Sequence, residues 1–191
     1  MPPRLLILAS GTGTLLQAVL DAAADGRLSV SIVAVGSDVA DCGALERAAW
    51  SSVPAFVCPP SDYESREDWN DALLAKLMEF EPDWIVSAGF MRILGPAIVD
   101  AYAGRILNTH PALLPSFPGA HAVRDALAYG VTVTGCTVHV VDRGVDTGPI
   151  LAQVAVPVLP DDSEATLHER IKEQERELLV TTLSRLIGEP S

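Results

Sequence analysis

LLILASGTGT, at residues 5–14, joins an unbroken apolar run to a turn of small residues. An apolar run without alternation is typical of a strand that is buried on both faces, as in a parallel sheet. A helical pattern follows at residues 15–22, so this part of the chain is predicted to be a strand, a turn and a helix. That order favours an α/β protein.

The alternation of strand and helix continues along the first half of the chain. Further buried strands are expected at residues 32–36, 54–58, 84–88 and 106–110, separated by helices at 45–50, 65–80 and 96–102. The pattern then changes to a helix at 122–129, β-rich runs at 133–141 and 150–158, and a helix from 163 to about 187. Two β-rich runs without a helix between them predict a hairpin. The fold class is therefore α/β, an open, mostly parallel twisted sheet that is Rossmann-like, with an antiparallel hairpin and a C-terminal helix.

Two helices carry finer signals. Ser65 and Asp68 predict a capping box at the start of helix 65–80, with Asp in place of the usual Glu. One face of that helix is expected to hold Leu73, Leu74, Leu77 and Met78. The polar residues of the last helix mostly indicate a solvated face; they are Glu164, His168, Glu169, Lys172, Glu173, Glu175 and Arg176.

Length and composition bound the kind of protein. With 191 residues, 49% hydrophobic and 20% charged, the chain predicts one globular domain over 1–191. Within it we expect a Rossmann-like, phosphate-binding half at 1–100 and a catalytic half at 101–191. The net charge of −12 opposes binding to nucleic acids and anionic membranes. Three scattered cysteines and a short first apolar run predict no disulfide framework, no metal site and a reduced, cytoplasmic protein.

The turn at residues 10–14 suits an anion. Small residues let backbone N–H groups approach a phosphate, and the following helix adds partial positive charge. Leu16 stands where a dinucleotide fingerprint needs its last glycine, and no Gly-Lys-Ser/Thr follows as in a P-loop. Asp38, just beyond the second strand, lies where a dinucleotide-binding acid would be expected. A tight turn without a ligand is the alternative.

A second polar feature is the run ILNTHPALLP at residues 106–115. Alternate residues of a strand share a face, so Asn108 and His110 are expected to point the same way and Thr109 the other way. Pro111 should end the strand at His110 because proline disfavours helix before it and cannot donate to a sheet.

Ligands of open α/β sheets bind beyond the carboxyl ends of the strands. This rule places the glycine turn, Gly89–Arg92 and the Asn108/His110 pair at one edge, and the hairpin loop can bring Asp146 to it. An amide, an imidazole and a carboxylate suit acyl transfer. No serine or cysteine lies in a nucleophile elbow, which favours direct transfer between two bound substrates. Taken alone, His110 is a structural turn histidine, and Asp146 belongs to a common Asp-Thr-Gly turn.

Together these motifs resemble the folate-dependent formyltransferase family, and within it the enzymes that act on glycinamide ribonucleotide. The resemblance covers nearly the whole chain and is carried by residues 10–18, 88–94, 108–115, 135–150 and 174–175. The Asn-x-His-Pro-x-Leu-Leu-Pro and Asp-x-Gly-Pro-Ile elements together make it specific.

The resemblance implies transfer of the formyl group of 10-formyltetrahydrofolate, as co-substrate and without a metal, to the amine of glycinamide ribonucleotide in purine biosynthesis. It implies catalytic positions at Asn108, His110 and Asp146. Ribonucleotide contacts are implied at Gly13, Thr14, Leu15 and Glu175. Folate contacts are implied at Arg66, Met91, Arg92, Ile93, Leu94, Asn108, Asp142, Arg143, Gly144, Val145 and Asp146. The resemblance thus also implies that the catalytic half at 101–191 is the folate-binding half.

One residue departs from the family pattern, because many members have Asn where this chain has Leu15. Three activities stay open at this point: glycinamide ribonucleotide formyltransferase, another folate formyltransferase or a formyltetrahydrofolate hydrolase, and a nucleotide-binding module without chemistry. The expected partners are small-molecule substrates, with no nucleic acid and no membrane, and the chain is expected to be a monomer or a homodimer.

Overall fold

The computed structural model describes residues 1–187, which form one seven-stranded sheet in the order β3-β2-β1-β4-β5-β6-β7. The strands are β1 (Arg4–Leu8), β2 (Ser31–Ser37), β3 (Ala55–Val57), β4 (Trp84–Ser87), β5 (Ile106–His110), β6 (Val133–Val140) and β7 (Ile150–Pro157). The helices are α1 (Thr14–Ala24), α2 (Gly43–Trp50), α3 (Arg66–Glu79), α4 (Pro96–Ala101), α5 (Ala122–Tyr129) and α6 (Glu164–Ile187). A 3₁₀ turn, η1, spans Pro60–Asp62.

The first five strands are parallel, and β6 and β7 are antiparallel to their neighbours. From β1 the chain builds outward through β2 and β3, then returns to place β4 on the other side of β1. The strand order therefore reverses between β1 and β4. In open α/β sheets this switch point opens a crevice at the carboxyl ends of the strands.

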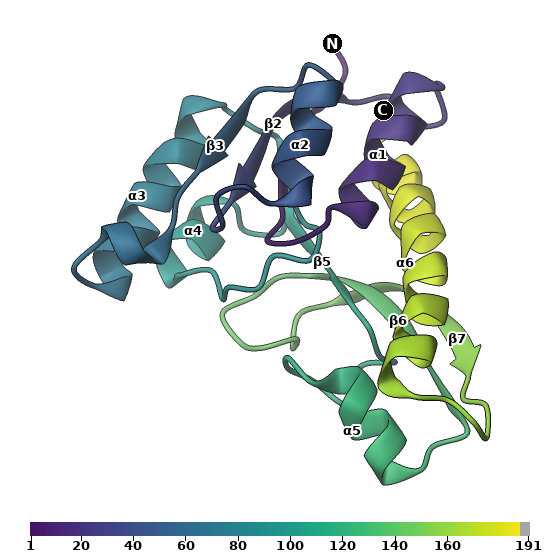
Figure 1. Cartoon of the computed structure of the whole chain (residues 1–191). Coiled ribbons are helices and arrows are strands. Elements are labelled where there is room, and N and C mark those ends of the chain that lie inside the picture. The colour runs from purple at the N-terminus through teal and green to yellow at the C-terminus, as the bar shows by residue number, and fades with distance from the viewer. Residues whose placement is uncertain (188–191) are drawn as a thin grey trace.

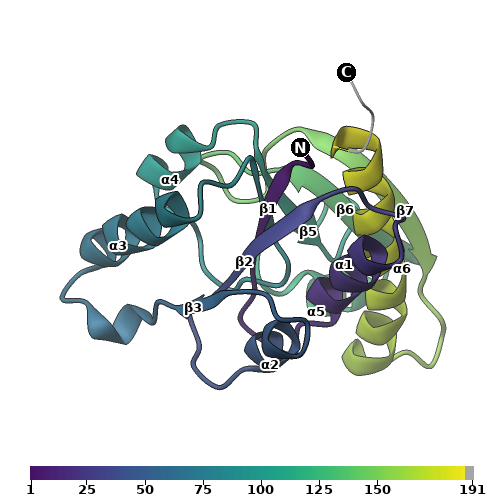
Figure 2. The ribbon, with the colours of Figure 1, turned by 90° about the horizontal axis from the view of Figure 1, so that it is seen from above.

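Helices cover both faces of the sheet (Figures 1 and 2). One face packs on α1, α2 and α6 through a cluster that includes Leu16, Val19 and Leu183. The other packs on α3 and α4 through Trp69, Leu73 and Ile98. A third cluster joins α5, β6, β7 and the N-terminal half of α6. β1 is 0% exposed from Leu5 to Leu8, as its continuous apolar run predicts.

The predicted fold class and element order are confirmed, with boundaries shifted by one or two residues. The capping role predicted for Ser65 is confirmed, because its Oγ accepts the Asp68 N–H at 3.1 Å. The return contact differs from a capping box, since the Asp68 carboxylate accepts the Ser65 hydroxyl at 2.6 Å. The expected apolar face of α3 was wrong for Met78, which is 59% exposed. Leu73 and Leu77 are buried as predicted, and Trp69 extends their face in place of Met78, since residues four apart stack along one side of a helix.

The solvated face predicted for α6 was wrong for Glu175, which is only 4% exposed. Within residues 1–187 no helix is both long and apolar enough to cross a membrane.

Candidate active site

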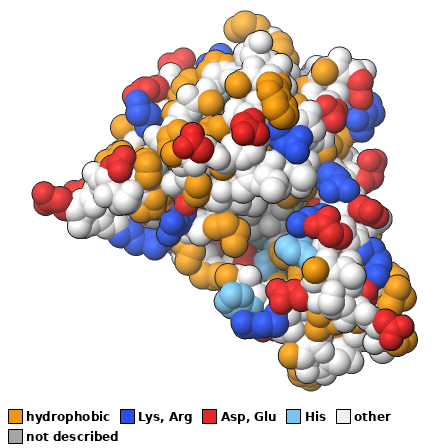
Figure 3. Space-filling view, in the orientation of Figure 1, with side chains coloured by type: hydrophobic (Ala, Val, Ile, Leu, Met, Phe, Trp, Pro, Cys, Tyr) orange, Lys and Arg blue, Asp and Glu red, His pale blue; other side chains and the backbone are white. Residues whose placement is uncertain are grey.

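The residues singled out by the sequence lie around the carboxyl ends of β1, β4 and β5. Ser10 follows β1, Gly89 follows β4, and the Ser10 N–H donates to the Gly89 carbonyl at 3.1 Å. In the space-filling view this side of the molecule is hollowed across its middle, and histidine side chains lie in the hollow (Figure 3). The switch point of the sheet and the polar residues of β5 lie at the same edge, because β1, β4 and β5 are adjacent parallel strands.

Asn108 is held by a residue from the neighbouring strand. It pairs directly with His139 in the β5–β6 ladder, and its Nδ2 lies 3.2 Å from His139 Nε2. An amide nitrogen only donates, so His139 Nε2 accepts in this contact. The other ring nitrogen, Nδ1, lies 3.0 Å from the Val140 carbonyl and donates to it. A neutral His139 thus fixes the Asn108 amide and leaves its second N–H free.

His110 is almost fully buried, at 4% exposure, and both its ring nitrogens face protein oxygens. Its Nε2 lies 2.8 Å from the Phe117 carbonyl, which can only accept, so Nε2 carries a hydrogen. Its Nδ1 lies 3.4 Å from Asp146 Oδ2. A protonated ring satisfies both neighbours at once.

The Asp146 carboxylate lies close to Gly119, His110 and His139, which come from three segments of the chain. It lies in the β6–β7 loop with a positive φ of 55°, and its Oδ2 accepts the Gly119 N–H at 2.7 Å. Its Oδ1 is 3.5 Å from His139 Nε2. The neutral His139 ring accepts from Asn108, whereas the protonated ring can donate from Nε2 to Asp146 Oδ1. A hydrogen bond from the protonated ring lowers the pKa of Asp146 most, and the Gly119 N–H and the charge of His110 lower it further against the opposing effect of burial. The carboxylate is therefore held in its charged form.

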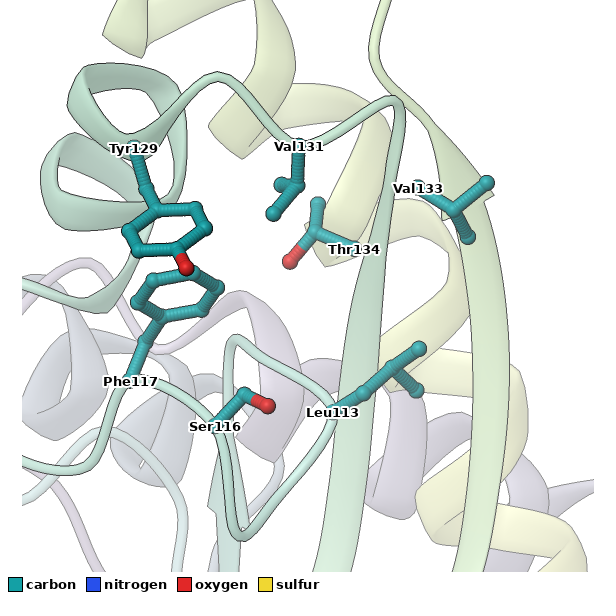
Figure 4. A pocket seen from close by; sticks show the side chains of 7 residues that line it. All are labelled: Leu113, Ser116, Phe117, Tyr129, Val131, Val133 and Thr134. Carbon is teal, nitrogen blue, oxygen red and sulfur yellow. The ribbon is translucent and has the colours of Figure 1, made fainter.

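The segment between β5 and α5 supports this cluster from one side, through the Phe117 carbonyl and the Gly119 N–H. Its other side lines a pocket of about 390 Å³ with the end of α5 and the start of β6. There the Phe117 ring meets Tyr129 edge to face, with 5.9 Å between centroids, and the Thr134 hydroxyl is directed inward (Figure 4). The segment between β5 and α5 therefore separates this pocket from His110 and Asp146.

The glycine turn is shaped by α2. Ala44 N–H donates to the Gly11 carbonyl at 3.0 Å, and Arg47 Nε donates to the Thr12 carbonyl at 2.8 Å. Gly13 has φ 72°, and a Cβ there would lie 2.7 Å from Ala44 Cα, so glycine is required.

The carbonyl and the following N–H of a trans peptide point in opposite directions. With both carbonyls held by α2, the N–H groups of Thr12 and Gly13 point away from it. The Gly13 carbonyl accepts from Gln17 N–H inside the helix, so the Thr14 N–H also points outward. Among the described residues these three N–H groups have no partner, and they form a set of donors at the start of α1.

The segment after β4 shows a similar division between bound and free groups. Ser10 forms hydrogen bonds with the Gly89 carbonyl and the Met91 N–H. The Ile93 carbonyl accepts from Arg66 at 2.8 Å, and the Gly95 N–H donates to Asn70 at 2.8 Å. These bonds hold one side of residues 89–95. Within residues 1–187, the N–H and C=O groups of Arg92 and Leu94 have no partner. The segment therefore presents an edge of free backbone groups, flanked by the exposed side chains of Met91 and Ile93.

The loop that ends at Asp146 is ordered by its own contacts. Arg143 pairs with Asp100 at the end of α4, with Nε 3.0 Å from Oδ1. Asp142 Oδ1 accepts from Gly144 N–H at 3.0 Å and from the Thr147 hydroxyl at 2.7 Å. Val145 is exposed at the tip.

Comparison with known proteins shows the family of this chain. The model of the family described as "Formyl transferase" matches residues 3–183. The chain belongs to the formyl transferase family. A phosphoribosylglycinamide formyltransferase from Mycobacterium tuberculosis is 59% identical over 97% of this chain and 85% of its own length. The enzyme of that name from Escherichia coli is 40% identical over 94% of this chain and 85% of its own length.

Solved structures agree. The crystal structure of glycinamide ribonucleotide transformylase 1 from Geobacillus kaustophilus is 45% identical, with a TM-score of 0.94 over 98% of this chain and 100% of that chain. The phosphoribosylglycinamide formyltransferase from Bacillus halodurans has a TM-score of 0.94 at 39% identity, over 97% of this chain and 96% of that chain.

Two acidic residues lie differently in this formyl transferase from what the sequence suggests. Asp38 has both carboxylate oxygens engaged, by Ser10 Oγ and by Arg92 Nε, so it does not face a ribose as a dinucleotide-binding acid would. Glu175 lies on the opposite side of β5 from Asn108 and His110, against Thr109. Burial raises the pKa of Glu175 to about 7, against the lowering effects of Lys172 and a hydrogen bond with Thr109.

The structure brings the three predicted catalytic residues together and shows how Leu15 and Thr14 lie at the start of α1. His110 and Asp146 are brought together directly, and Asn108 joins them through His139. Leu15 packs in the core with 9% exposure, so only its backbone is available to a ligand. Thr14 remains partly exposed at the start of α1.

Sequence reasoning missed His139, Gly119 and Arg47, which hold Asn108, Asp146 and the glycine turn. One signal for His139 was present in the sequence: it is a histidine in a predicted strand, on the same face as Thr137 two residues before it. Among residues 1–187 no group of three His, Cys, Asp or Glu side chains is placed to hold a metal ion.

Proposed function

We propose that this formyl transferase moves the formyl group of 10-formyltetrahydrofolate to the amine of glycinamide ribonucleotide. The products are formylglycinamide ribonucleotide and tetrahydrofolate, as in de novo purine biosynthesis. The observation that carries the proposal is the cluster of Asn108, His110, His139 and Asp146 beside two sets of free backbone groups. The names of the relatives supply the substrate pair.

In the proposed reaction the neutral amine attacks the formyl carbon, a new C–N bond forms, and the C–N bond to the folate nitrogen breaks. Negative charge develops on the formyl oxygen. The second N–H of Asn108, held in place by His139, is the donor aimed at that charge.

His110 is tied to the Phe117 carbonyl through Nε2, so its first role is to carry positive charge beside Asp146. It becomes a second donor to the formyl oxygen if Nε2 leaves that carbonyl.

Asp146 moves the proton. The attacking amine must lose one proton and the leaving folate nitrogen must gain one. A carboxylate whose pKa is lowered by its neighbours stays ionised at neutral pH, and it can accept the amine proton directly or through water and pass it on.

Each of the two sets of free backbone groups is assigned to one substrate. Outward N–H groups at Thr12, Gly13 and Thr14 suit the phosphate of the ribonucleotide, where the start of α1 adds partial positive charge. The free groups of Arg92 and Leu94 suit the donor and acceptor edge of a pterin ring. The division into halves at 1–100 and 101–191 stays a prediction, and the proposed pterin contacts at Arg92 and Leu94 fall in the first half rather than the second. Residues 188–191 lie outside the described part of the chain.

The roles of Glu175 and of the Asp142–Asp146 loop in substrate binding stay predictions, as do the cytoplasmic location and a monomeric or homodimeric state. All three cysteines are free and buried, which is consistent with a reducing compartment.

The test supplies purified protein with both substrates and follows tetrahydrofolate by absorbance and the formylated ribonucleotide by mass spectrometry. Formation of both products supports the proposal, whereas a folded sample that forms neither contradicts it. Formate release without the ribonucleotide would identify a hydrolase instead. Formylation of a different amine would identify another folate formyltransferase.

A further inference from the structure

Ser10 joins the two edges of the switch-point crevice. It begins the glycine turn, and its backbone N–H donates to the Gly89 carbonyl at 3.1 Å. Its Oγ accepts the Met91 N–H at 2.8 Å. One residue thus contacts both the proposed phosphate-binding turn and the proposed pterin-binding segment.

Asp38 controls the hydroxyl of Ser10. Its side chain, at the end of β2, is 1% exposed, and its Oδ1 accepts the Ser10 hydroxyl. Because the hydroxyl proton is directed to Asp38, a lone pair of Ser10 Oγ is left for the Met91 N–H. The buried carboxylate therefore sets the direction of the hydrogen bond that holds Met91.

The second oxygen of Asp38 holds the next residue along. Arg92 Nε donates to Oδ2 at 2.7 Å, while the Arg92 side chain stays 46% exposed. This contact turns the Arg92 side chain toward β2 and leaves the Arg92 backbone N–H and C=O free. Charge-assisted bonds of this kind are stronger than neutral ones and more specific in direction.

We propose that Asp38 is a positioning residue for the folate substrate: through Ser10 and Arg92 it fixes the backbone of residues 89–94 so that the groups of Arg92 and Leu94 face the pterin. The inference rests on the proposed function. The glycine turn depends less on Asp38, because Ala44 and Arg47 hold that turn independently.

The decisive variant is Asp38→Asn, which keeps size and removes the charge. An amide offers one acceptor oxygen where the site needs two, so one of the two donors loses its partner. We expect the KM for 10-formyltetrahydrofolate to rise roughly tenfold or more, as loss of a charge-assisted bond at a binding edge implies. The KM for the ribonucleotide should change less than about threefold, and kcat should stay within about threefold.

A matched control is Asp162→Asn, because Asp162 is also a buried carboxylate, with 3% side-chain exposure, and is paired with an arginine, Arg170. It lies at the start of α6 and lines neither proposed edge. We expect it to lower the melting temperature without raising either KM. A purely structural role for Asp38 would give the same pattern as Asp162→Asn, and that result would overturn the proposal.

A double-variant cycle tests the route through Ser10. Ser10→Ala removes the hydroxyl through which Asp38 acts on Met91. The double variant Ser10→Ala/Asp38→Asn should therefore raise the folate KM by less than the product of the fold-changes of the two single variants. Full multiplication of the two effects would contradict a shared route.

Titration of each variant with 10-formyltetrahydrofolate alone separates the two proposals. If the unmodified protein binds this ligand but forms no product with the ribonucleotide, the proposed function fails while the positioning role can still be measured. If the unmodified protein is active and Asp38→Asn binds the ligand equally well, only the positioning role fails.

Discussion

Asn108 and His139 face each other across the β5–β6 ladder, with 3.2 Å between Nδ2 of the amide and Nε2 of the ring. Neither residue neighbours the other in sequence, and β6 runs antiparallel to β5. The pairing decides which way the Asn108 amide points. It also places a second histidine at 3.5 Å from Asp146, so His139 links the proposed oxyanion donor to the proposed proton carrier.

Replacement of His139 by Ala tests this link. Without the ring, the Asn108 amide can rotate, and its donor leaves the direction that the formyl oxygen requires. We expect kcat to fall roughly ten- to a hundredfold, the range for a misplaced group near the reacting atoms, with smaller changes in both KM values. Steady-state kinetics with each substrate varied will measure this. His168→Ala, which replaces a half-buried histidine near the start of α6, is the control and should leave kcat unchanged. Equal losses in the two variants would remove His139 from the site.

Replacement of Asp146 by Asn keeps the shape of the side chain and removes its ability to take a proton. We expect kcat to fall by about two orders of magnitude or more, as for loss of an acid–base group. The Gly119 N–H can still donate to the amide oxygen, so the loop should stay in place. Single-turnover rates at saturating substrate will show the effect, with exposed Asp161→Asn as control. Turnover near that of the unmodified protein would exclude Asp146 from proton transfer.

The fold could be predicted because buried parallel strands have continuous apolar runs, as at residues 5–9, and these runs are local signals. The order of the strands is not local. That β6 packs on β5, and so brings His139 to Asn108, depends on which edge of the sheet the hairpin joins. Composition of the hairpin alone does not specify that edge.

The polar residues show the same limit. Glu175 has polar neighbours in sequence, so its position predicted exposure, yet α6 turns it toward Thr109 and the core. Asp38 had the position of a dinucleotide-binding acid, but Arg92, 54 residues later in the chain, neutralises it. In both cases a contact between distant segments decides the role.

Arg47 gives a prediction for the ribonucleotide site. Its guanidinium holds the Thr12 carbonyl and Gln17 Oε1, both neutral acceptors, so its charge remains available beside the glycine turn. Arg47→Met should release the Thr12 carbonyl and raise the KM for the ribonucleotide roughly tenfold, with the folate KM unchanged. Inhibition by inorganic phosphate should weaken in parallel.

The control for Arg47 is Arg27→Met, because Arg27 is an exposed arginine paired with Asp25 and lies away from the turn. It removes the same charge from the protein. If both variants raise the ribonucleotide KM equally, net charge and not the geometry of the turn is responsible.

Glu175 gives a prediction about stability and pH. Its pKa is about 7 in the folded protein, raised by burial from an ordinary value of 4.5. Below pH 4.5 the carboxyl is protonated in both states, so it causes no penalty. Between pH 4.5 and 7 the unfolded chain releases the proton while the folded chain keeps it, so the free energy of unfolding decreases as pH rises. Above pH 7 the penalty is complete, at about 3 kcal/mol.

Glu175→Gln removes this penalty, since an amide does not ionise. Urea unfolding of both proteins at pH 5 and pH 8, without substrates, will measure the difference. We expect similar stabilities at pH 5 and a variant more stable by about 2–3 kcal/mol at pH 8. A difference of the same size at both pH values would mean that packing or hydrogen bonding, and not ionisation, separates the two proteins. A variant less stable at pH 8 would mean that the buried carboxylate is stabilised by Lys172 and Arg176 more than burial destabilises it.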